Sequence, residues 1–313
     1  GSEALPVFWG KPWGGVHSTQ HQGPITPNAK KPEMNIIESQ TVGKHSLADC
    51  EDAVVATPDF VAVIDGSTSK TPHKLHPQMS NGRLCMMATS HFVRQMPADL
   101  SLPQFCGQVT AHIHALYPAD DTPMKTRPQE RLCASAVVYS ALRHEVWMVG
   151  DCQCMINGQV FRNDKPYEDV LAHQRAAVFQ EMLTAHPDMV RDGRIVHDYA
   201  RDTILEKLVG SMSGENRTYA VIDGFPIFMP GVKVIPVEDH GAEIVLASDG
   251  YPFLRPTLQE SEAALRKLLA QDPYCIRSFV ATKGTMLGNR SFDDRAYVRF
   301  RLSDDPPGKG HTR

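Results

Sequence analysis

The chain of 313 residues lacks several features that would place it in a membrane, outside the cell or on nucleic acid. No apolar run reaches the roughly 18 to 20 residues of a membrane-spanning helix. The N-terminus lacks the basic and then apolar pattern of a secretory signal peptide. The 32 lysines and arginines do not exceed the 36 aspartates and glutamates, whereas a nucleic-acid binder usually carries a basic excess or patch. We therefore expect a soluble, cytoplasmic protein with no membrane or nucleic-acid partner, and the sequence leaves its oligomeric state open.

Two common kinds of site are also missing. The seven cysteines are scattered, and only Cys152 and Cys154 lie close together, so the two spaced pairs of a structural zinc site are absent. We expect buried, reduced thiols instead. The glycine-containing stretch 10–15 lacks the flanking strand and helix that a phosphate-binding loop requires.

Composition divides the chain into three segments. Residues 1–33 are rich in glycine, proline and histidine and show no helical or strand periodicity. We expect this segment to be flexible and partly derived from an expression tag, because it opens on a Gly-Ser dipeptide that resembles a cleavage remnant. An arm that docks on another molecule is the alternative. Residues 34–303, opening at Met34 as the expected native start, should form one folded domain, and residues 304–313 a disordered tail.

Apolar periodicity within residues 34–303 groups the expected elements into blocks of strands and blocks of helices. The expected strands are 34–39, 53–56, 60–64, 133–142, 145–149, 153–161 with a turn at Asn157-Gly158, 218–222, 232–237, 243–247 and 295–302. The expected helices are 81–95, 103–116, 168–185, 198–211 and 258–271. Strict alternation of strand and helix is absent, so the grouping predicts a layered α+β domain and not a doubly wound one.

Aspartates stand at the ends of these strands: three follow an apolar strand and three precede one. They are, in chain order, Asp52, Asp65, Asp151, Asp249, Asp293 and Asp294. Carboxylates gathered at one rim repel one another and raise each other's pKa unless a cation neutralises them, and oxygen ligands suit Mg²⁺ or Mn²⁺. For a single Asp-Gly a tight turn is the better interpretation, which we apply to Asp223-Gly224. Four or more such carboxylates in this order favour a metal site.

Five separate motifs occur in the order found in the 2C-type metal-dependent protein phosphatases, the PPM-like serine/threonine phosphatases. They are Cys50-Glu51-Asp52-Ala53, Val63-Ile64-Asp65-Gly66, Val149-Gly150-Asp151-Cys152, Leu246-Ala247-Ser248-Asp249-Gly250, and Lys283-Gly284 followed by Asp293-Asp294. The sequence thus resembles this family from about residue 34 to 302. The resemblance implies that residues 34–303 are a catalytic domain, with a central antiparallel β-sandwich flanked by pairs of antiparallel helices in α-β-β-α layers.

The resemblance also implies a centre of two Mg²⁺ or Mn²⁺ ions, with a third ion as an option. The residues implied as metal ligands are Asp52, Asp65, Gly66, Asp151, Asp249 and Asp293, of which the four aspartates Asp52, Asp65, Asp249 and Asp293 are also implied as catalytic. Asp65 would bridge both ions, Asp52 would hold a metal-bound water, and Asp151 would serve an additional, weaker position. A metal-activated water would attack phosphorus in line, without a covalent intermediate.

One departure from the family pattern concerns phosphate binding. The family usually has an arginine five residues before the aspartate of its first motif, and Leu47 stands at that position here. Lys44 or His45 is the candidate replacement, although a lysine is a point charge without the two-pronged fork of a guanidinium.

A second departure lies just after Asp65-Gly66. The family's His-Gly-Gly is replaced by the stretch Ser67-Thr68-Ser69-Lys70. A family histidine near this position is implied as the general acid, and His73 or His76 is the candidate for that role here. A histidine in a loop is, however, more often an ordinary solvated group.

The leading hypothesis is therefore a metal-dependent phosphatase, a phosphoric monoester hydrolase that acts on phosphoserine or phosphothreonine in a phosphorylated protein. The missing arginine and the altered loop leave two alternatives open. One is a catalytically weak protein of the same fold that binds a phosphorylated partner or scaffolds it. The other is a phosphatase of small phosphorylated metabolites.

Overall fold

The computed structural model describes residues 31–304. Of the terminal segments expected at 1–33 and 304–313, residues 1–30 and 305–313 lie outside the described residues. The described chain enters the fold at Glu33, whose backbone N–H donates to the Ser303 hydroxyl (2.9 Å), so the two ends of the folded region lie side by side.

Two five-stranded sheets form the centre of the molecule, and every strand pair in them is antiparallel. The first sheet has the order β10 (Lys233–Pro236), β5 (Glu145–Val149), β4 (Ala134–Ser140), β3 (Phe60–Gly66) and β2 (Asp52–Ala56). The second has the order β1 (Met34–Val42), β12 (Arg295–Leu302), β11 (Glu243–Ala247), β6 (Gln153–Ile156) and β7 (Gln159–Phe161). A separate small hairpin joins β8 (Val190–Arg191) to β9 (Arg194–Ile195).

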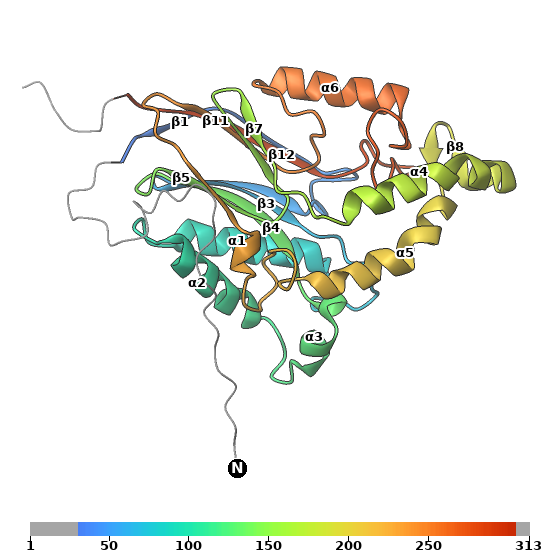
Figure 1. The fold of residues 1–313 in the computed structure, drawn as a ribbon, viewed down its shortest axis with the longest axis horizontal. Coiled ribbons are helices and arrows are strands. Elements are labelled where there is room, and N and C mark those ends of the chain that lie inside the picture. Colours follow the sequence, from blue (N-terminus) through green and yellow to red (C-terminus); the bar gives the residue numbers. More distant parts are fainter. Residues whose placement is uncertain (1–30, 305–313) are drawn as a thin grey trace, which may run out of the picture.

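Helices cover the outer faces of this sandwich (Figure 1). The helices are α1 (Asn81–Gln95), α2 (Leu102–His114), the short α3 (Thr122–Thr126), α4 (Glu168–Ala185), α5 (Tyr199–Ser211) and α6 (Leu258–Gln271). The pair α1 and α2 lies against the first sheet, α6 lies over the second, and the pair α4 and α5 lies toward one end of the sandwich (Figure 1). The expected α+β class, with a central antiparallel β-sandwich between helical layers, is confirmed.

The alternation of side chains along β3 explains both the core and the position of its terminal aspartate. Ala62 and Ile64 belong to the apolar cluster under α1 and α2, whereas Val61 and Val63 belong to the cluster between the two sheets. Each valine or isoleucine side chain buried in this way contributes about 1.5–3 kcal/mol. Because successive strand side chains point to opposite faces, Asp65 follows Val61 and Val63 onto the inner face. A carboxylate is thereby directed toward the second sheet.

One expected strand is absent from the described part of the chain. Residues 218–222 make only isolated bridges, one of them between Ile222 and Ala134 at the start of β4. The side chain of Asn216 caps the segment by accepting from Val221 N–H (3.1 Å) and donating to its carbonyl (3.0 Å). These local bonds compete with a ladder, so the β-branched composition does not produce a strand here.

Other expectations about the chain are met. The expected hairpin of 53–56 and 60–64 is present as β2 and β3, and the turn at Asn157-Gly158 separates β6 from β7. All seven cysteines are buried and unpaired, as expected for reduced thiols. Among residues 31–304, no helix combines the length and the apolar character that a membrane span requires.

Candidate active site

Strand ends from both sheets bring three carboxylates together. Asp65 lies at the end of β3, Asp151 follows β5, and Asp249 follows β11. One carboxylate oxygen from each of the three lies within 4.8 Å of the others. Ligands on opposite sides of one Mg²⁺ ion are roughly 4 Å apart, since each Mg–O distance is about 2.0–2.1 Å. The three carboxylates therefore converge almost as closely as ligands of a single ion.

Local backbone geometry places Asp151 in this group. Gly150 adopts a φ of +92°, and a Cβ atom there would lie 2.2 Å from the Ser135 hydroxyl oxygen, so only glycine fits the turn. The Ser135 hydroxyl donates to Asp151 Oδ1 (2.9 Å) and accepts from the Asp151 backbone N–H (3.3 Å). The turn and the serine together fix the carboxylate beside Asp65.

The acidic group is electrostatically unbalanced without a cation. Burial, and then the charges of Asp52 and Asp293, raise the pKa of Asp65 well above its ordinary value. Burial also raises the pKa of Asp52 and of Asp249, and in Asp249 the charges of Asp65 and Asp151 add to the effect. Among the described residues, neither oxygen of Asp52, nor Asp249 Oδ1, has a hydrogen-bond partner. Buried polar atoms are rarely left in this state, so this all-oxygen set fits a hard divalent cation.

The two consecutive aspartates before β12 have different surroundings. Asp293 forms an ion pair with Lys283 (Nζ–Oδ2 2.9 Å). Asp294 accepts hydrogen bonds from the backbone N–H groups of Lys44 (2.8 Å) and Glu51 (3.0 Å). Asp294 thus ties the β1–β2 connection to the start of β12, whereas Asp293 remains beside the acidic group with a lysine as counter-charge.

Glu51, which precedes Asp52, is bound at the start of α1. Its carboxylate oxygens accept from the hydroxyls of Thr68 (2.6 Å) and Ser80 (2.8 Å), and Ser80 is also the N-cap of that helix. An acidic group near a helix N-terminus is stabilised by the helix dipole. A Cβ atom at Gly82 would lie 2.0 Å from Glu51 Oε2, so a glycine is needed for this contact. The arrangement fixes the start of β2 against α1.

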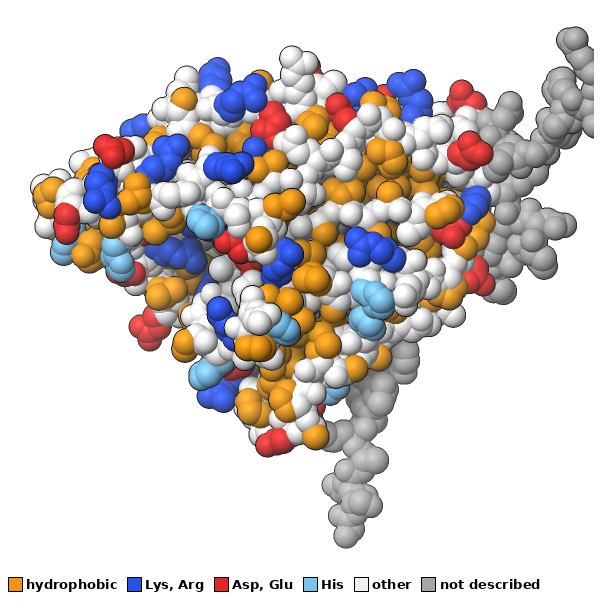
Figure 2. Space-filling model, turned by 180° about the vertical axis from the view of Figure 1, so that it is seen from behind, with side chains coloured by type: hydrophobic (Ala, Val, Ile, Leu, Met, Phe, Trp, Pro, Cys, Tyr) orange, Lys and Arg blue, Asp and Glu red, His pale blue; other side chains and the backbone are white. Residues whose placement is uncertain are grey.

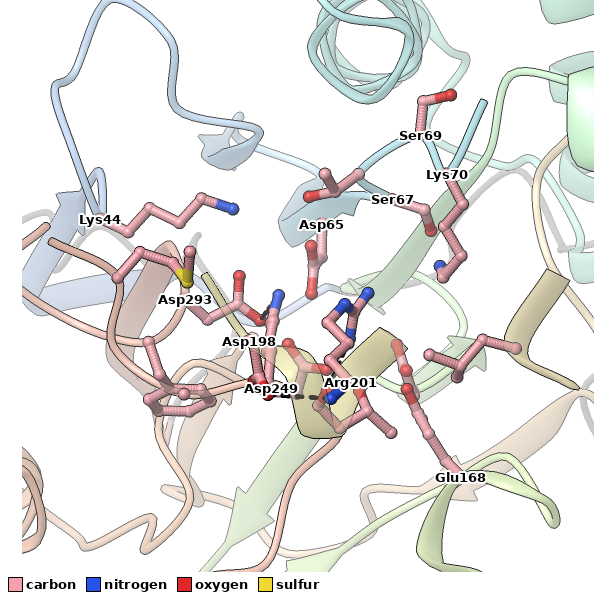
Figure 3. Close-up of a pocket in the computed structure, with 18 of the residues that line it drawn as sticks. Lys44, Asp65, Ser67, Ser69, Lys70, Glu168, Asp198, Arg201, Asp249 and Asp293 are labelled. Carbon is pink, nitrogen blue, oxygen red and sulfur yellow. Dashed lines mark hydrogen bonds and ion pairs between the residues drawn. The ribbon is translucent and has the colours of Figure 1, made fainter. Parts of the chain in front are cut away.

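A cavity of about 420 Å³ opens on the acidic group. The predicted ligands that line it are Asp65, Gly66, Asp151, Asp249 and Asp293. Asp52 lies behind them and is only 3% exposed. Cations line the same cavity, namely Lys44, Lys70, Lys165, Arg201 and Lys283, and Figure 3 shows Lys44 and Lys70 on opposite sides of Asp65.

The residues predicted to contact substrate divide into one that reaches the cavity and three that do not. Lys44 lines it. His45 instead faces Asp49 (Nδ1–Oδ2 2.9 Å), and His73 faces Glu130 (Nδ1–Oε2 3.0 Å) with 72% of its side chain exposed. His76 accepts from the Gln78 N–H (3.1 Å). Since none of these histidines is among the residues lining the cavity, the structure gives no support to His45 as a phosphate ligand or to His73 or His76 as the general acid.

Sequence reasoning missed most of the cationic side of the cavity. Arg201 lies in the first turn of α5, and Lys165 lies just before α4. Their distance along the chain from the aspartate motifs hides them, because only the packing of α4 and α5 brings them to the cavity. Lys70 could have been suspected from the sequence, since it ends the 67–70 stretch that departs from the family pattern.

Comparison with solved structures finds serine/threonine phosphatases at low sequence identity. PppA, described as a key regulatory component of the T6SS in Pseudomonas aeruginosa, is 16% identical, with 87% of this chain and 99% of that chain covered and a TM-score of 0.43. The catalytic domain of the protein phosphatase PstP in complex with two manganese ions is 14% identical (87% and 100% covered, TM-score 0.43). The PPM phosphatase MsPP from Mycobacterium smegmatis is 15% identical (86% and 100% covered, TM-score 0.43).

No family model matches the sequence, and no curated protein matches it. At 14–16% identity, the structural similarity to these three proteins is distant.

Proposed function

We propose that residues 34–303 form a metal-dependent phosphatase that hydrolyses phosphoserine and phosphothreonine in proteins. The observation that carries this proposal is the convergence of Asp65, Asp151 and Asp249 at one end of a cavity whose walls also carry five lysine and arginine side chains. Carboxylates attract divalent cations, and cations attract a phosphate ester. A site that combines both is suited to bring a phosphoryl group to a metal centre.

Asp65, Asp151 and Asp249 would hold the first divalent ion, because their oxygens already lie together. Asp293 and Gly66 line the same cavity, and the Asp293 carboxylate and the Gly66 carbonyl are the proposed ligands of a second ion. When bound, such ions neutralise charge on the phosphoryl oxygens and lower the pKa of water. Mg²⁺ and Mn²⁺ both suit an all-oxygen set.

Two further side chains have roles that do not depend on direct ligation. Asp52 is buried and lies opposite Asp65 on the neighbouring strand. Its carboxylate, which has no hydrogen-bond partner among the described residues, would hold a proton or accept a hydrogen bond from a water molecule at the metal centre. Lys283 neutralises Asp293, and the carboxylates of Asp293 and Asp249 raise its pKa although burial opposes its charge. Lys283 therefore remains protonated and limits the repulsion within the acidic group.

The experiment is hydrolysis of a chromogenic phenyl phosphate, a phosphothreonine peptide and a sugar phosphate, each measured with Mn²⁺ and with EDTA. We expect Mn²⁺-dependent release of phosphate from the peptide, and none with EDTA. Turnover of the sugar phosphate alone would instead indicate a phosphatase of small metabolites. Absence of metal-dependent turnover with all three substrates would contradict the proposal, and tight binding of the phosphopeptide under those conditions would favour a phospho-partner binding protein.

A further inference from the structure

Three cations in the cavity wall, Lys44, Lys70 and Arg201, form no ion pair among the described residues. Two of them, Lys70 and Arg201, lie close enough for their charges to interact. Lys165 and Lys283 are each paired with a carboxylate, Asp151 at 3.7 Å and Asp293 at 2.9 Å. Within residues 31–304 no ion pair includes the side chain of Lys70 or of Arg201, although both line the cavity. Cations at the wall of a partly enclosed site cost free energy unless an anion joins them.

The neighbouring charges do not remove this imbalance. Burial lowers the pKa of Lys70 to about 8, and the charges of Lys165 and Arg201 act in the same direction. Asp202, the residue after Arg201, faces His197 (2.5 Å), and Asp198, three residues before it, is paired with Arg175 (2.8 Å). Glu168 is the carboxylate that remains near Lys70, and it makes no ion pair with Lys70 or Arg201.

Arg201 is held in place from its own side of the cavity. Its backbone N–H bonds the Asp198 carboxylate, the N-cap of α5 (2.8 Å), and one guanidinium nitrogen donates to the Thr282 carbonyl (2.6 Å). The rest of the guanidinium points into the cavity, as does the ammonium of Lys70 from the loop after β3 (Figure 3). A fixed guanidinium loses little entropy on binding an anion and presents a planar fork to it.

The cationic pair is a local feature of the cavity and does not belong to a broad basic surface. The whole chain has a formal charge of −4, and Figure 2 shows acidic and basic side chains interspersed over the face it presents. The cavity of about 420 Å³ falls in the range of about 300–1,000 Å³ typical of sites that bury a whole small ligand. It therefore has room for more of a substrate than its phosphoryl group.

We propose that Lys70 and Arg201 form a subsite for a second anionic group of the substrate, an aspartate, glutamate or second phosphorylated residue that flanks the phosphorylated one. The inference rests on the proposed function, since it assumes that a phosphoryl group occupies the acidic end of the cavity. It makes the protein selective for acidic phosphopeptides.

Binding tests this selectivity without turnover. Three fluorescent peptides carry the phosphonate analogue of phosphoserine, whose C–P bond is not hydrolysed, and differ only in having two aspartates, two alanines or two lysines beside it. Dissociation constants come from fluorescence anisotropy in the presence of Mn²⁺. We expect the aspartate peptide to bind about tenfold more tightly than the alanine peptide, as for charge-assisted hydrogen bonds, and the lysine peptide to bind most weakly.

Matched variants assign the selectivity to the two residues. Lys70→Gln and Arg201→Gln should each bring the ratio of the alanine and aspartate dissociation constants close to 1. Lys74→Gln in the same loop and Arg217→Gln are exposed controls and should keep the wild-type ratio. A residue that only bound the reacting phosphoryl group would weaken both peptides equally and preserve the ratio, which would overturn the inference.

The outcomes separate this inference from the proposed function. Equal affinity of the wild-type protein for the three peptides, or no binding of any of them, would overturn the second-anion subsite even if Mn²⁺-dependent hydrolysis is observed. Selective binding that depends on Lys70 and Arg201, with no hydrolysis of any phosphate ester, would support the subsite and contradict the proposed enzymatic activity.

Discussion

Asp52 and Asp65 are register partners on the neighbouring antiparallel strands β2 and β3. Directly opposed residues share one face of a sheet, and like charges placed there destabilise the pair. Here both carboxylates are directed between the sheets, where burial raises the pKa of each. Such a pairing is costly to the fold by itself, and a bound cation is the simplest way to offset it.

Asp65→Asn should abolish most of the metal-dependent activity without lowering the stability of the metal-free fold. The amide keeps the shape of the side chain but removes a charge, so Mn²⁺-dependent turnover should fall at least roughly 100-fold. In EDTA the thermal midpoint should stay the same or rise, because repulsion with Asp52 and Asp249 is reduced. Phosphatase rates and thermal melts with and without Mn²⁺ provide the test.

Asp192→Asn is the matched control for that variant. Asp192 is exposed in a turn with a φ of +52°, a conformation that asparagine tolerates. Its rates and midpoints should equal those of the wild type. If Mn²⁺ raises the midpoint of Asp65→Asn as much as that of the wild type, Asp65 is not a metal ligand.

Stability without metal should depend on pH in a defined direction. The pKa values of Asp52, Asp65 and Asp249 are raised in the fold, so above the ordinary aspartate value of 3.8 the folded state holds more protons than the unfolded state. Stability in EDTA therefore falls as pH rises above about 4 through these raised pKa values. Metal binding requires ionised carboxylates, so the gain in midpoint from Mn²⁺ should grow from pH 5 to pH 8. A gain that shrinks with pH would count against metal binding at these carboxylates.

Lys283→Met should tighten metal binding. The ammonium lies 2.9 Å from an oxygen of Asp293 and repels any divalent ion placed beside that residue. Calorimetric titration with Mn²⁺ should therefore give a dissociation constant several-fold lower than in the wild type. Lys267→Met, an exposed change on α6, should leave it unchanged. Weaker Mn²⁺ binding by Lys283→Met would mean that the lysine supports the site in some other way.

Asp223→Asn should affect the fold and leave the chemistry intact. The sequence predicts a turn at Asp223-Gly224, and the structure confirms it, since Phe225 N–H donates to Asp223 Oδ1 (2.9 Å). The same side chain is fully buried and paired with Arg131 (3.0 Å). Breaking such a pair costs about 3 kcal/mol, which urea unfolding would measure, while turnover per folded molecule should match the wild type. Loss of Mn²⁺-dependent turnover in the folded variant would show that the proposed position of the metal site is wrong.

The strands and most helices could be predicted because their apolar periodicity agrees with the fold they adopt. The ends of β5, β11, α4 and α6 match the sequence pattern to the residue. Residues 218–222 have the composition of a strand, but the bonds made by Asn216 replace the ladder. A local polar contact of this kind does not alter the apolar periodicity of the sequence, so the pattern cannot reveal it.

The acidic part of the site could be predicted for a different reason than the cationic part. Aspartates at strand ends converge wherever the strands do, so Asp65, Asp151 and Asp249 followed from the strand pattern and the family resemblance. Arg201 reaches the cavity only because α5 packs beside it, and that packing depends on the whole fold. For the same reason His73, although close to Asp65 in sequence, turns outward to Glu130.

The most direct measurement is the anomalous scattering of Mn²⁺ in crystals soaked with the ion. We expect an anomalous peak in contact with the carboxylates of Asp65, Asp151 and Asp249, with manganese–oxygen distances near 2.2 Å, roughly 0.1 to 0.2 Å longer than for Mg²⁺. A second peak beside Asp293 would show that a metal ion can replace the Lys283 ammonium as the partner of that carboxylate. Crystals that bind Mn²⁺ elsewhere, with no peak at Asp65, would contradict the proposed metal site.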